Sequence, residues 1–191
     1  MSWTINQTDR NKDDIERLTA AIKVAVSRRI LLFCSVSDQG VKSDGLFPAN
    51  CDRGNIFQIG AATVSGKTWD WVGANDVDFI FPGTGLRVDT RNPQERSLKP
   101  ISGSSLATAL ASGLAALILY CVGLNNPQEL ELVRTYTTMK QAFHTISKDG
   151  DKSKYIPVWD LFDKAKEEGP TKTSQCILQE VVSTLLSHAR R

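Results

Sequence analysis

The chain has 191 residues, of which 41% are hydrophobic and 23% are charged, proportions typical of a globular protein. Its 23 basic and 21 acidic residues leave a formal net charge of only +2. This balance argues against nucleic acid or an anionic membrane surface as a partner, because both require a clustered excess of positive charge.

The cysteines and histidines predict neither a metal site nor a cofactor. Cys34, Cys51, Cys121 and Cys176 include no pair at C-x-x-C spacing, and the chain has two histidines. Two of the cysteines lie in apolar runs, where a free thiol packs as a small hydrophobic group. We interpret all four as reduced thiols of an intracellular, cytoplasmic protein. The polar start of the chain also lacks the pattern of a signal peptide.

The first part of the chain alternates strand and helix patterns. A short strand is expected at Met1–Ile5, and a helix from Asp13 to Arg29 has apolar residues at helical spacing. Ile30–Cys34 is a continuous apolar run, which is typical of a buried parallel strand. Further strands are expected at 55–62, 69–71 and 78–81, the last of which is stopped by a Pro-Gly turn. This alternation predicts an α/β fold with a parallel sheet.

The longest apolar segment, Leu106–Val122, lies in a stretch without charge that extends from Ile101 to Gln128. Two interpretations are open for this segment. Its length is at the short limit for a membrane span, and it contains Thr108 and Ser112, so a buried helix is preferred. An amphipathic helix is expected from Asn125 and can continue through Met139 and Phe143, and a last helix at 175–189 follows a linker at 164–173. We predict two regions, a main domain at 1–165 and a linker with a terminal helix at 166–191.

The segment Gly103-Ser104-Ser105-Leu106-Ala107 resembles the Gly-Thr-Ser-x-Ala segment of the subtilases, the subtilisin-like serine peptidases of the S8/S53 class. In that family the segment opens a buried central helix, and a glycine follows the serine by eight residues, as Gly113 does here. Ala109 replaces a proline of the family pattern. Four other landmarks follow the family order: Met1-Ser2-Trp3, Phe47-Pro48-Ala49, Ile56–Ala61 and Phe81-Pro82-Gly83. The resemblance covers residues 1 to about 124 and extends more loosely to about 165.

The resemblance implies the carboxyl-terminal half of a subtilisin-like domain that acts on a peptide or protein substrate. It identifies Ser105 as the nucleophile, with Ser2, Trp3, Ser35 and Val36 lining the substrate cleft. A serine at the amino end of a helix also lies near free amides, which can stabilise an oxyanion. The alternative is that Ser104 or Ser105 only caps the helix.

Two catalytic features of the family are missing from the sequence. No histidine precedes Ser105, and neither His144 nor His188 has the family's His-Gly-Thr surroundings. The first strand with its aspartate is absent, and the Asp-Thr pair at 89–90 is followed by arginine instead of glycine. Asp38 stands where the family has the asparagine of the oxyanion hole, and a carboxylate donates no hydrogen bond. A solvated turn aspartate is the alternative interpretation of Asp38.

These departures leave three functions open. The chain is either a fragment of a serine endopeptidase, inactive alone, or a non-catalytic interaction module of a larger intracellular protein. In both cases the other domains of a longer parent chain are possible partners, since an isolated half-sheet exposes an unpaired edge. A nucleotide site at Pro82–Gly85 is the weakest option, because the stretch lacks the G-x-G-x-x-G and Walker patterns.

Overall fold

The structure is a computed structural model that describes residues 1–40, 45–73, 77–87, 100–148, 154–160 and 173–187. A parallel three-stranded sheet lies at its centre, in the order β2-β4-β5, and a small antiparallel pair is formed by β1 and β3. The strands are β1 (Ile5–Asn6), β2 (Leu32–Ser35), β3 (Leu46–Phe47), β4 (Ile56–Ala62) and β5 (Phe79–Pro82). The predicted α/β class and parallel sheet are therefore confirmed.

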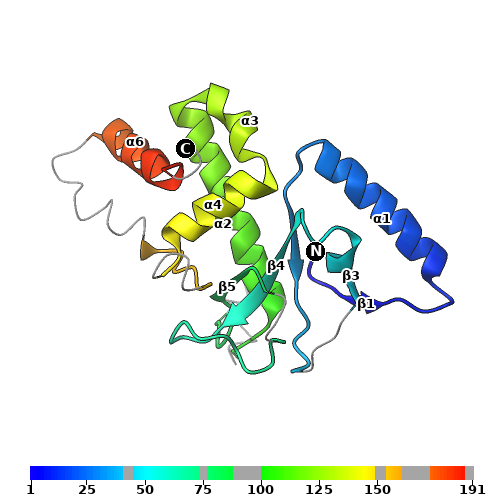
Figure 1. The fold of residues 1–191 in the computed structure, drawn as a ribbon. Helices are drawn as coiled ribbons and strands as arrows, with labels where there is room; N and C mark the ends of the chain where they lie inside the picture. The colour runs from blue at the N-terminus through cyan, green and yellow to red at the C-terminus, as the bar shows by residue number, and fades with distance from the viewer. Residues whose placement is uncertain (41–44, 74–76, 88–99, 149–153, 161–172, 188–191) are drawn as a thin grey trace, which may run out of the picture.

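Helices cover both faces of this sheet. Figure 1 shows α1 on one side of the strands, and α2, α4 and α6 on the other. The helices are α1 (Lys12–Ser27), α2 (Ser104–Asn125), α3 (Leu130–Val133), α4 (Tyr136–Ile146) and α6 (Ser174–Leu185), with short 3-10 turns at Ala49–Cys51 and Pro127–Glu129. The apolar side chains of α6 belong to the same core as those of α2 and α4.

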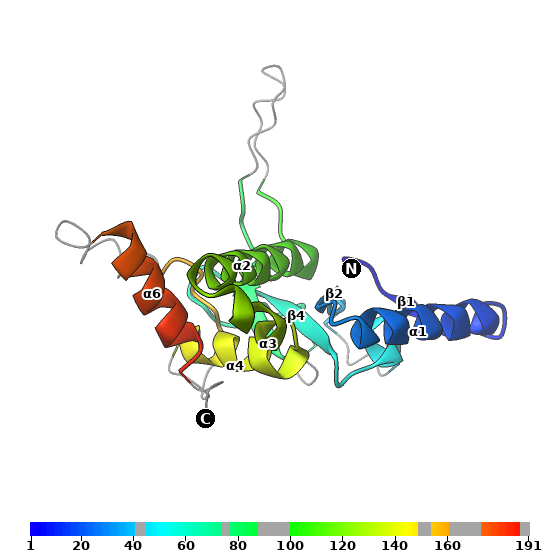
Figure 2. The same ribbon diagram turned by 90° about the horizontal axis from the view of Figure 1, so that it is seen from above.

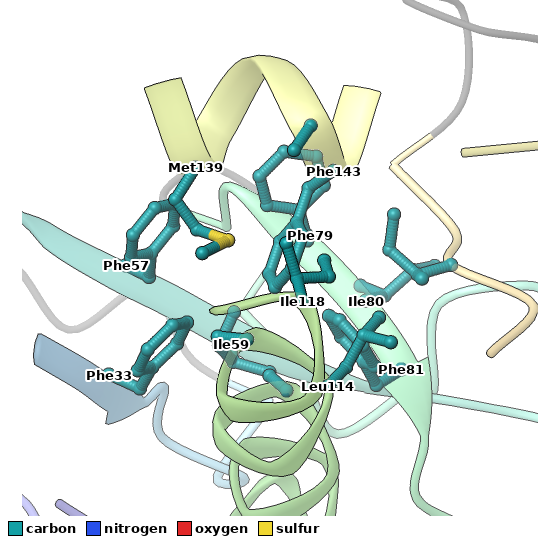
Figure 3. Packing of buried hydrophobic residues seen from close by; sticks show 14 of the residues in the cluster. Phe33, Phe57, Ile59, Phe79, Ile80, Phe81, Leu114, Ile118, Met139 and Phe143 are labelled. Atoms are coloured by element: carbon teal, nitrogen blue, oxygen red, sulfur yellow. The ribbon is translucent and has the colours of Figure 1, made fainter. Parts of the chain in front are cut away.

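Side chains point alternately to the two faces of the sheet along each strand, and this divides the core into two clusters. Phe33 and Phe57 stack with ring centroids 4.8 Å apart and pack with Phe143 of α4. Figure 3 shows these rings with Phe79 and Phe81, between α4 and the side chains of α2. Their strand neighbours Cys34 and Ile56 belong to a second cluster with Ile22 of α1. Both faces are buried because successive side chains of a strand point to opposite sides.

Two predicted elements are wrong in detail. Trp69–Trp71 forms a turn instead of a strand: the Trp69 amide bonds to the Ala61 carbonyl, and the Val72 amide bonds back to Trp69. The helix expected to run from Asn125 through Phe143 is divided into α3 and α4. Thr135 causes the division, because its side chain accepts a hydrogen bond from the Thr138 amide and caps α4. The linker predicted before α6 lies, up to residue 172, outside the described residues.

The prediction of a buried α2 holds for one face only. Ala107, Ala111, Leu114 and Ile118 are buried against the sheet, whereas the opposite face exposes an apolar stripe. That stripe includes Leu110, Leu117, Tyr120 and Leu124. By length and composition alone, α2 is also the one helix among the described residues that could cross a bilayer. An uncharged apolar segment can therefore form a helix that is buried on all sides or a helix with one exposed face, and the sequence alone does not distinguish the two.

All four cysteines are free thiols. Cys34 and Cys51 are buried, Cys121 is half-buried and Cys176 is exposed. Burial raises the pKa of the Cys34 thiol from 9.0 to about 11, against smaller opposing effects of the terminal amine and the Ala49 backbone. Cys34 therefore packs as an un-ionised apolar group between β2 and α1, as its place in an apolar run predicted.

An ionic contact joins Asp78, the residue before β5, to α4. The Lys140 ammonium donates to Asp78 Oδ1 at 2.7 Å, and the Tyr136 hydroxyl donates to the same oxygen at 3.2 Å. The other carboxylate oxygen, Oδ2, accepts from the Gln58 amide at 2.9 Å. Asp78 is only 14% exposed, so its hydrogen bonds are partly shielded from water and salt.

We expect Asp78→Asn to lower the free energy of unfolding by about 1–3 kcal/mol, because Lys140 and Tyr136 lose their charged acceptor. Urea unfolding followed by circular dichroism measures this loss. Asp14→Asn is the control, since Asp14 forms an ion pair with Arg17 in which both side chains are more than 70% exposed. Equal effects of the two substitutions would contradict a structural role for Asp78.

Candidate active site

Ser105 is the second residue of α2 and is half-buried. The first amides of a helix have no partner within it. Here the Ser104 amide is bound by Asp38 and the Leu106 amide by the Gly103 carbonyl. Within the described residues, neither the amide nor the hydroxyl of Ser105 has a hydrogen-bond partner. Ser105 thus offers a donor and a hydroxyl together, at the positive end of a 22-residue helix.

The carboxylate of Asp38 lies beside this helix end. Its Oδ2 accepts from the Ser104 amide at 2.8 Å, and its Oδ1 accepts from the Ser104 hydroxyl at 2.5 Å. A β-carbon placed on Gly103 would lie 3.5 Å from Asp38 Oδ2 and 3.3 Å from Ser105 Oγ. Asp38 therefore binds the helix end directly, which excludes a purely solvated turn, and it borders the same glycine as the Ser105 hydroxyl.

Ser104 connects the helix end to the sheet. Its hydroxyl oxygen accepts from the Ala61 amide of β4 at 3.0 Å while its proton is donated to Asp38. The residue is fully buried. Gly83, at the end of β5, completes the support: its carbonyl accepts from the Gly103 amide at 2.8 Å. A β-carbon on Gly83 would come within 2.7 Å of the Ala61 side chain, so no larger residue fits without displacement.

The four residues predicted to line a substrate cleft lie around the carboxyl end of β2. The Ser35 amide donates to the Met1 carbonyl at 3.0 Å, which places Ser2 beside Ser35. Val36 is half-buried and its amide bonds to Ile59, whereas Trp3 is 46% exposed. This end of the sheet also carries Asp38, three residues after Ser35. Ligand sites of parallel sheets lie at such strand ends.

The structure places His144 in α4. The His144 ring packs against Phe79, with ring centroids 4.8 Å apart. Gly83, whose carbonyl binds the Gly103 amide at the start of α2, follows Phe79 by four residues, or roughly 13 Å at the usual rise of a strand. His144 therefore lies at the other end of β5 from the helix end that carries Ser105. His188 and the Asp-Thr pair at 89–90 lie outside the described residues. Among the residues that the structure describes, no histidine adjoins the Ser105 hydroxyl.

Two supporting features were not found from the sequence. The sequence indicates only a capping role for Ser104, because its bridge between Asp38 and Ala61 depends on contacts distant in the chain. The second feature is the turn at Trp69–Val72, where the Gly40 amide donates to the Trp71 carbonyl at 2.8 Å and fixes the loop that carries Asp38. The paired tryptophans of that turn are the available signal, although their pattern predicts a strand.

The neighbouring serines provide a matched test of this geometry. Ser104→Ala leaves the buried Ala61 amide without an acceptor, so we expect a loss of about 1–3 kcal/mol in the free energy of unfolding. Ser105→Ala removes a hydroxyl without a partner among the described residues, and we expect a change within about 0.5 kcal/mol. Urea unfolding of both variants measures the difference, and a larger loss from Ser105→Ala would refute the assignment of roles.

Comparison with known proteins identifies the family of the chain. The model of the Subtilase family, Peptidase_S8, matches residues 1–155. No curated protein matches the chain.

Among solved structures, a lanthipeptide protease is similar with a TM-score of 0.61 and 15% identity, over 81% of this chain and 55% of that one. The prenylagaramide maturation protease PagA is similar with a TM-score of 0.51 and 18% identity, over 87% of this chain and 54% of that one. The PatG macrocyclase in complex with peptide is similar with a TM-score of 0.52 and 18% identity, over 68% of this chain and 38% of that one. The chain thus spans about half the length of these structures or less. At these identities the structural likeness shows the fold, and the family match shows that the chain belongs to the subtilase family.

Proposed function

We propose that this chain carries the nucleophile side of a serine endopeptidase site, with Ser105 as the nucleophile, and that it does not cleave peptides alone. The observation that carries the proposal is the open amide and hydroxyl of Ser105 at the amino end of α2. The substrate would be a peptide or protein of an intracellular compartment, lying along Ser2, Trp3, Ser35 and Val36. A neighbouring fold is described with a bound peptide, which agrees with this substrate class.

The reaction would be acyl transfer. The Ser105 oxygen attacks the carbonyl carbon of the peptide, its proton passes to a base, and the carbonyl oxygen becomes an oxyanion near the Ser105 amide. The amine then leaves with a proton, and water hydrolyses the acyl-enzyme. A serine hydroxyl needs a neighbouring base to react at a useful rate. Among the described residues none occupies that place, so the base would come from elsewhere.

Asp38 adds a second reason for low activity. An ionised carboxylate beside the Ser105 amide repels a developing oxyanion and replaces a donor with an acceptor. Loss of one oxyanion donor typically costs about 100- to 1000-fold in rate. The bond from Asp38 to Ser104 holds the carboxylate at that helix end.

The same bond supports an alternative function. A carboxylate fixed on the helix end stabilises the amino terminus of α2 through its dipole. In this view the chain is a non-catalytic member of the family, and Asp38 and Ser104 only maintain the fold for an interaction with other domains. Reactivity of Ser105 separates the two functions, because the interaction module requires none.

Chemical rescue tests the proposal. The complete chain is incubated with a fluorophosphonate probe, with and without imidazole as an external base, and mass spectrometry locates the adduct. We expect modification of Ser105 only when imidazole is present, because the hydroxyl lacks a base. Asp38→Asn should increase the rescued rate, by up to about 100-fold, because it removes the negative charge beside the developing oxyanion while its amide oxygen can still accept one of the two Ser104 hydrogen bonds.

Ser105→Ala is the matched control and should abolish the adduct, while the folded state persists. Absence of any adduct at Ser105 in both the parent chain and Asp38→Asn would reject the nucleophile assignment and favour the interaction module. Modification at another serine, unchanged in Ser105→Ala, would reject it as well.

A further inference from the structure

Two free thiols that the proposed reaction does not use lie in one buried cluster. Cys34 of β2 and Cys51 of the 3-10 turn at Ala49–Cys51 both belong to the cluster between the sheet and α1. The other cysteines lie elsewhere: Cys121 packs on the larger core around α2, and Cys176 is exposed on α6. In Figure 2, α1 lies on the other side of β2 from α2. The sheet therefore separates the first two thiols from Cys121.

Contacts of each thiol bring this pair together. The Ala49 backbone forms a hydrogen bond with the Cys34 thiol, and Cys51 follows Ala49 by two residues in the same turn. Two residues of a 3-10 helix advance the chain by only about 4 Å. On the side of α1, the Thr19 hydroxyl lies 3.3 Å from Cys51 Sγ. The two sulfur atoms are thus neighbours inside one cluster, as the formation of a disulfide requires.

The two thiols differ in reactivity. Burial raises the pKa of the Cys34 thiol to about 11, and the neighbouring Cys51 adds to this increase. Cys34 is also completely buried, whereas 8% of Cys51 is exposed. Since the thiolate is the form that reacts with peroxides, Cys34 is the poorer first nucleophile. Cys51 is therefore the thiol that is oxidised first, and Cys34 is placed to react with the product.

A groove gives a small oxidant a path toward Cys51. It lies between α1 and β3, has a volume of about 360 Å³, and includes Ile15, Thr19 and Phe47 in its lining. Thr19 therefore borders the groove and contacts the Cys51 sulfur. Hydrogen peroxide is little larger than a water molecule, which occupies about 30 Å³, so the groove has ample room for it.

We propose that Cys51 and Cys34 form an oxidation site at which hydrogen peroxide produces a disulfide. The Cys51 sulfur attacks one peroxide oxygen, the O–O bond breaks, and Cys51 becomes a sulfenic acid while water leaves. The Cys34 sulfur then attacks the Cys51 sulfur. The S–S bond forms, the S–O bond breaks, and the hydroxyl leaves with the Cys34 proton as a second water. Two thiols are oxidised and one peroxide is reduced, whether or not Ser105 reacts.

The disulfide would close the loop that carries Asp38. Asp38 lies between the two cysteines in the sequence, four residues after Cys34. A cross-link between β2 and the turn at Ala49–Cys51 therefore fixes both ends of the segment that holds the carboxylate at the start of α2. It also restricts the unfolded chain, which stabilises the folded state.

Peptide mapping tests the site directly. The complete chain is treated with hydrogen peroxide without denaturant, alkylated and digested with trypsin, which separates the two cysteines into residues 30–42 and 43–53. We expect these peptides to be linked with the loss of two hydrogens, and dithiothreitol to separate them. Cys176→Ser is the control and should give the same link, because Cys176 lies outside the cluster. Absence of the link in the folded parent chain overturns the proposal.

A matched pair of variants tests the order of the two steps. Dimedone, which traps sulfenic acids, should modify Cys51 in Cys34→Ser, because no thiol remains to react with the sulfenic acid. Cys51→Ser should give about tenfold to 100-fold less adduct at Cys34, since a thiol of pKa about 11 has about 100-fold less thiolate than one of pKa 9.0. Stronger modification of Cys34 than of Cys51 overturns the assigned order.

Urea unfolding measures the effect of the cross-link on the fold. The oxidised parent chain should unfold at a midpoint about 1 M higher than the reduced chain, because the bond closes a loop of the unfolded chain. Neither serine variant should gain stability from the same treatment, and dithiothreitol should reverse the gain in the parent. A link that forms only in urea, or one that lowers the midpoint, overturns the proposal, because the folded geometry then opposes the bond.

Discussion

The bond between Asp38 and Ser104 is the contact on which the geometry of the candidate site depends. It joins the loop after β2 to Ser104, the first residue of α2. The Ser104 hydroxyl in turn accepts a hydrogen bond from the Ala61 amide of β4. Three elements that are distant in the sequence therefore meet at one buried hydroxyl. Buried groups of this kind hold a unique arrangement, because any displacement leaves a donor or acceptor without a partner.

The same contact has opposite effects on fold and chemistry. Negative charge at the amino end of α2 stabilises the helix by roughly 0.3–1 kcal/mol, and by more when partly buried. The oxyanion of an acyl transfer would also be negative and would form near the same amides. Two anions cannot share one helix end without repulsion. Under the proposed function, Asp38 would therefore stabilise the helix end of the site and at the same time disfavour the reaction.

Much of the fold could be predicted because local patterns determine it. The apolar runs at β2 and β4 and the charge-free α2 have lengths and periods that a buried sheet and its helix require. The turn at Trp69–Val72 was missed, because aromatic and β-branched residues favour strands when tertiary contacts are ignored. The break at Thr135 was missed for a similar reason, since a threonine cap competes with an otherwise continuous amphipathic pattern.

The site was less predictable, because its chemistry depends on which way the side chains point and which partners they bind, and a sequence does not contain that information. The motif around Ser105 indicates a helix end, and the position of Asp38 indicates an altered donor. Neither indicates that Ser104 binds the carboxylate, or that the Ser105 amide and hydroxyl have no partner among the described residues. The exposed stripe of α2 has the same origin: residues such as Leu117 read as core, and only the arrangement of neighbouring elements decides whether anything covers them.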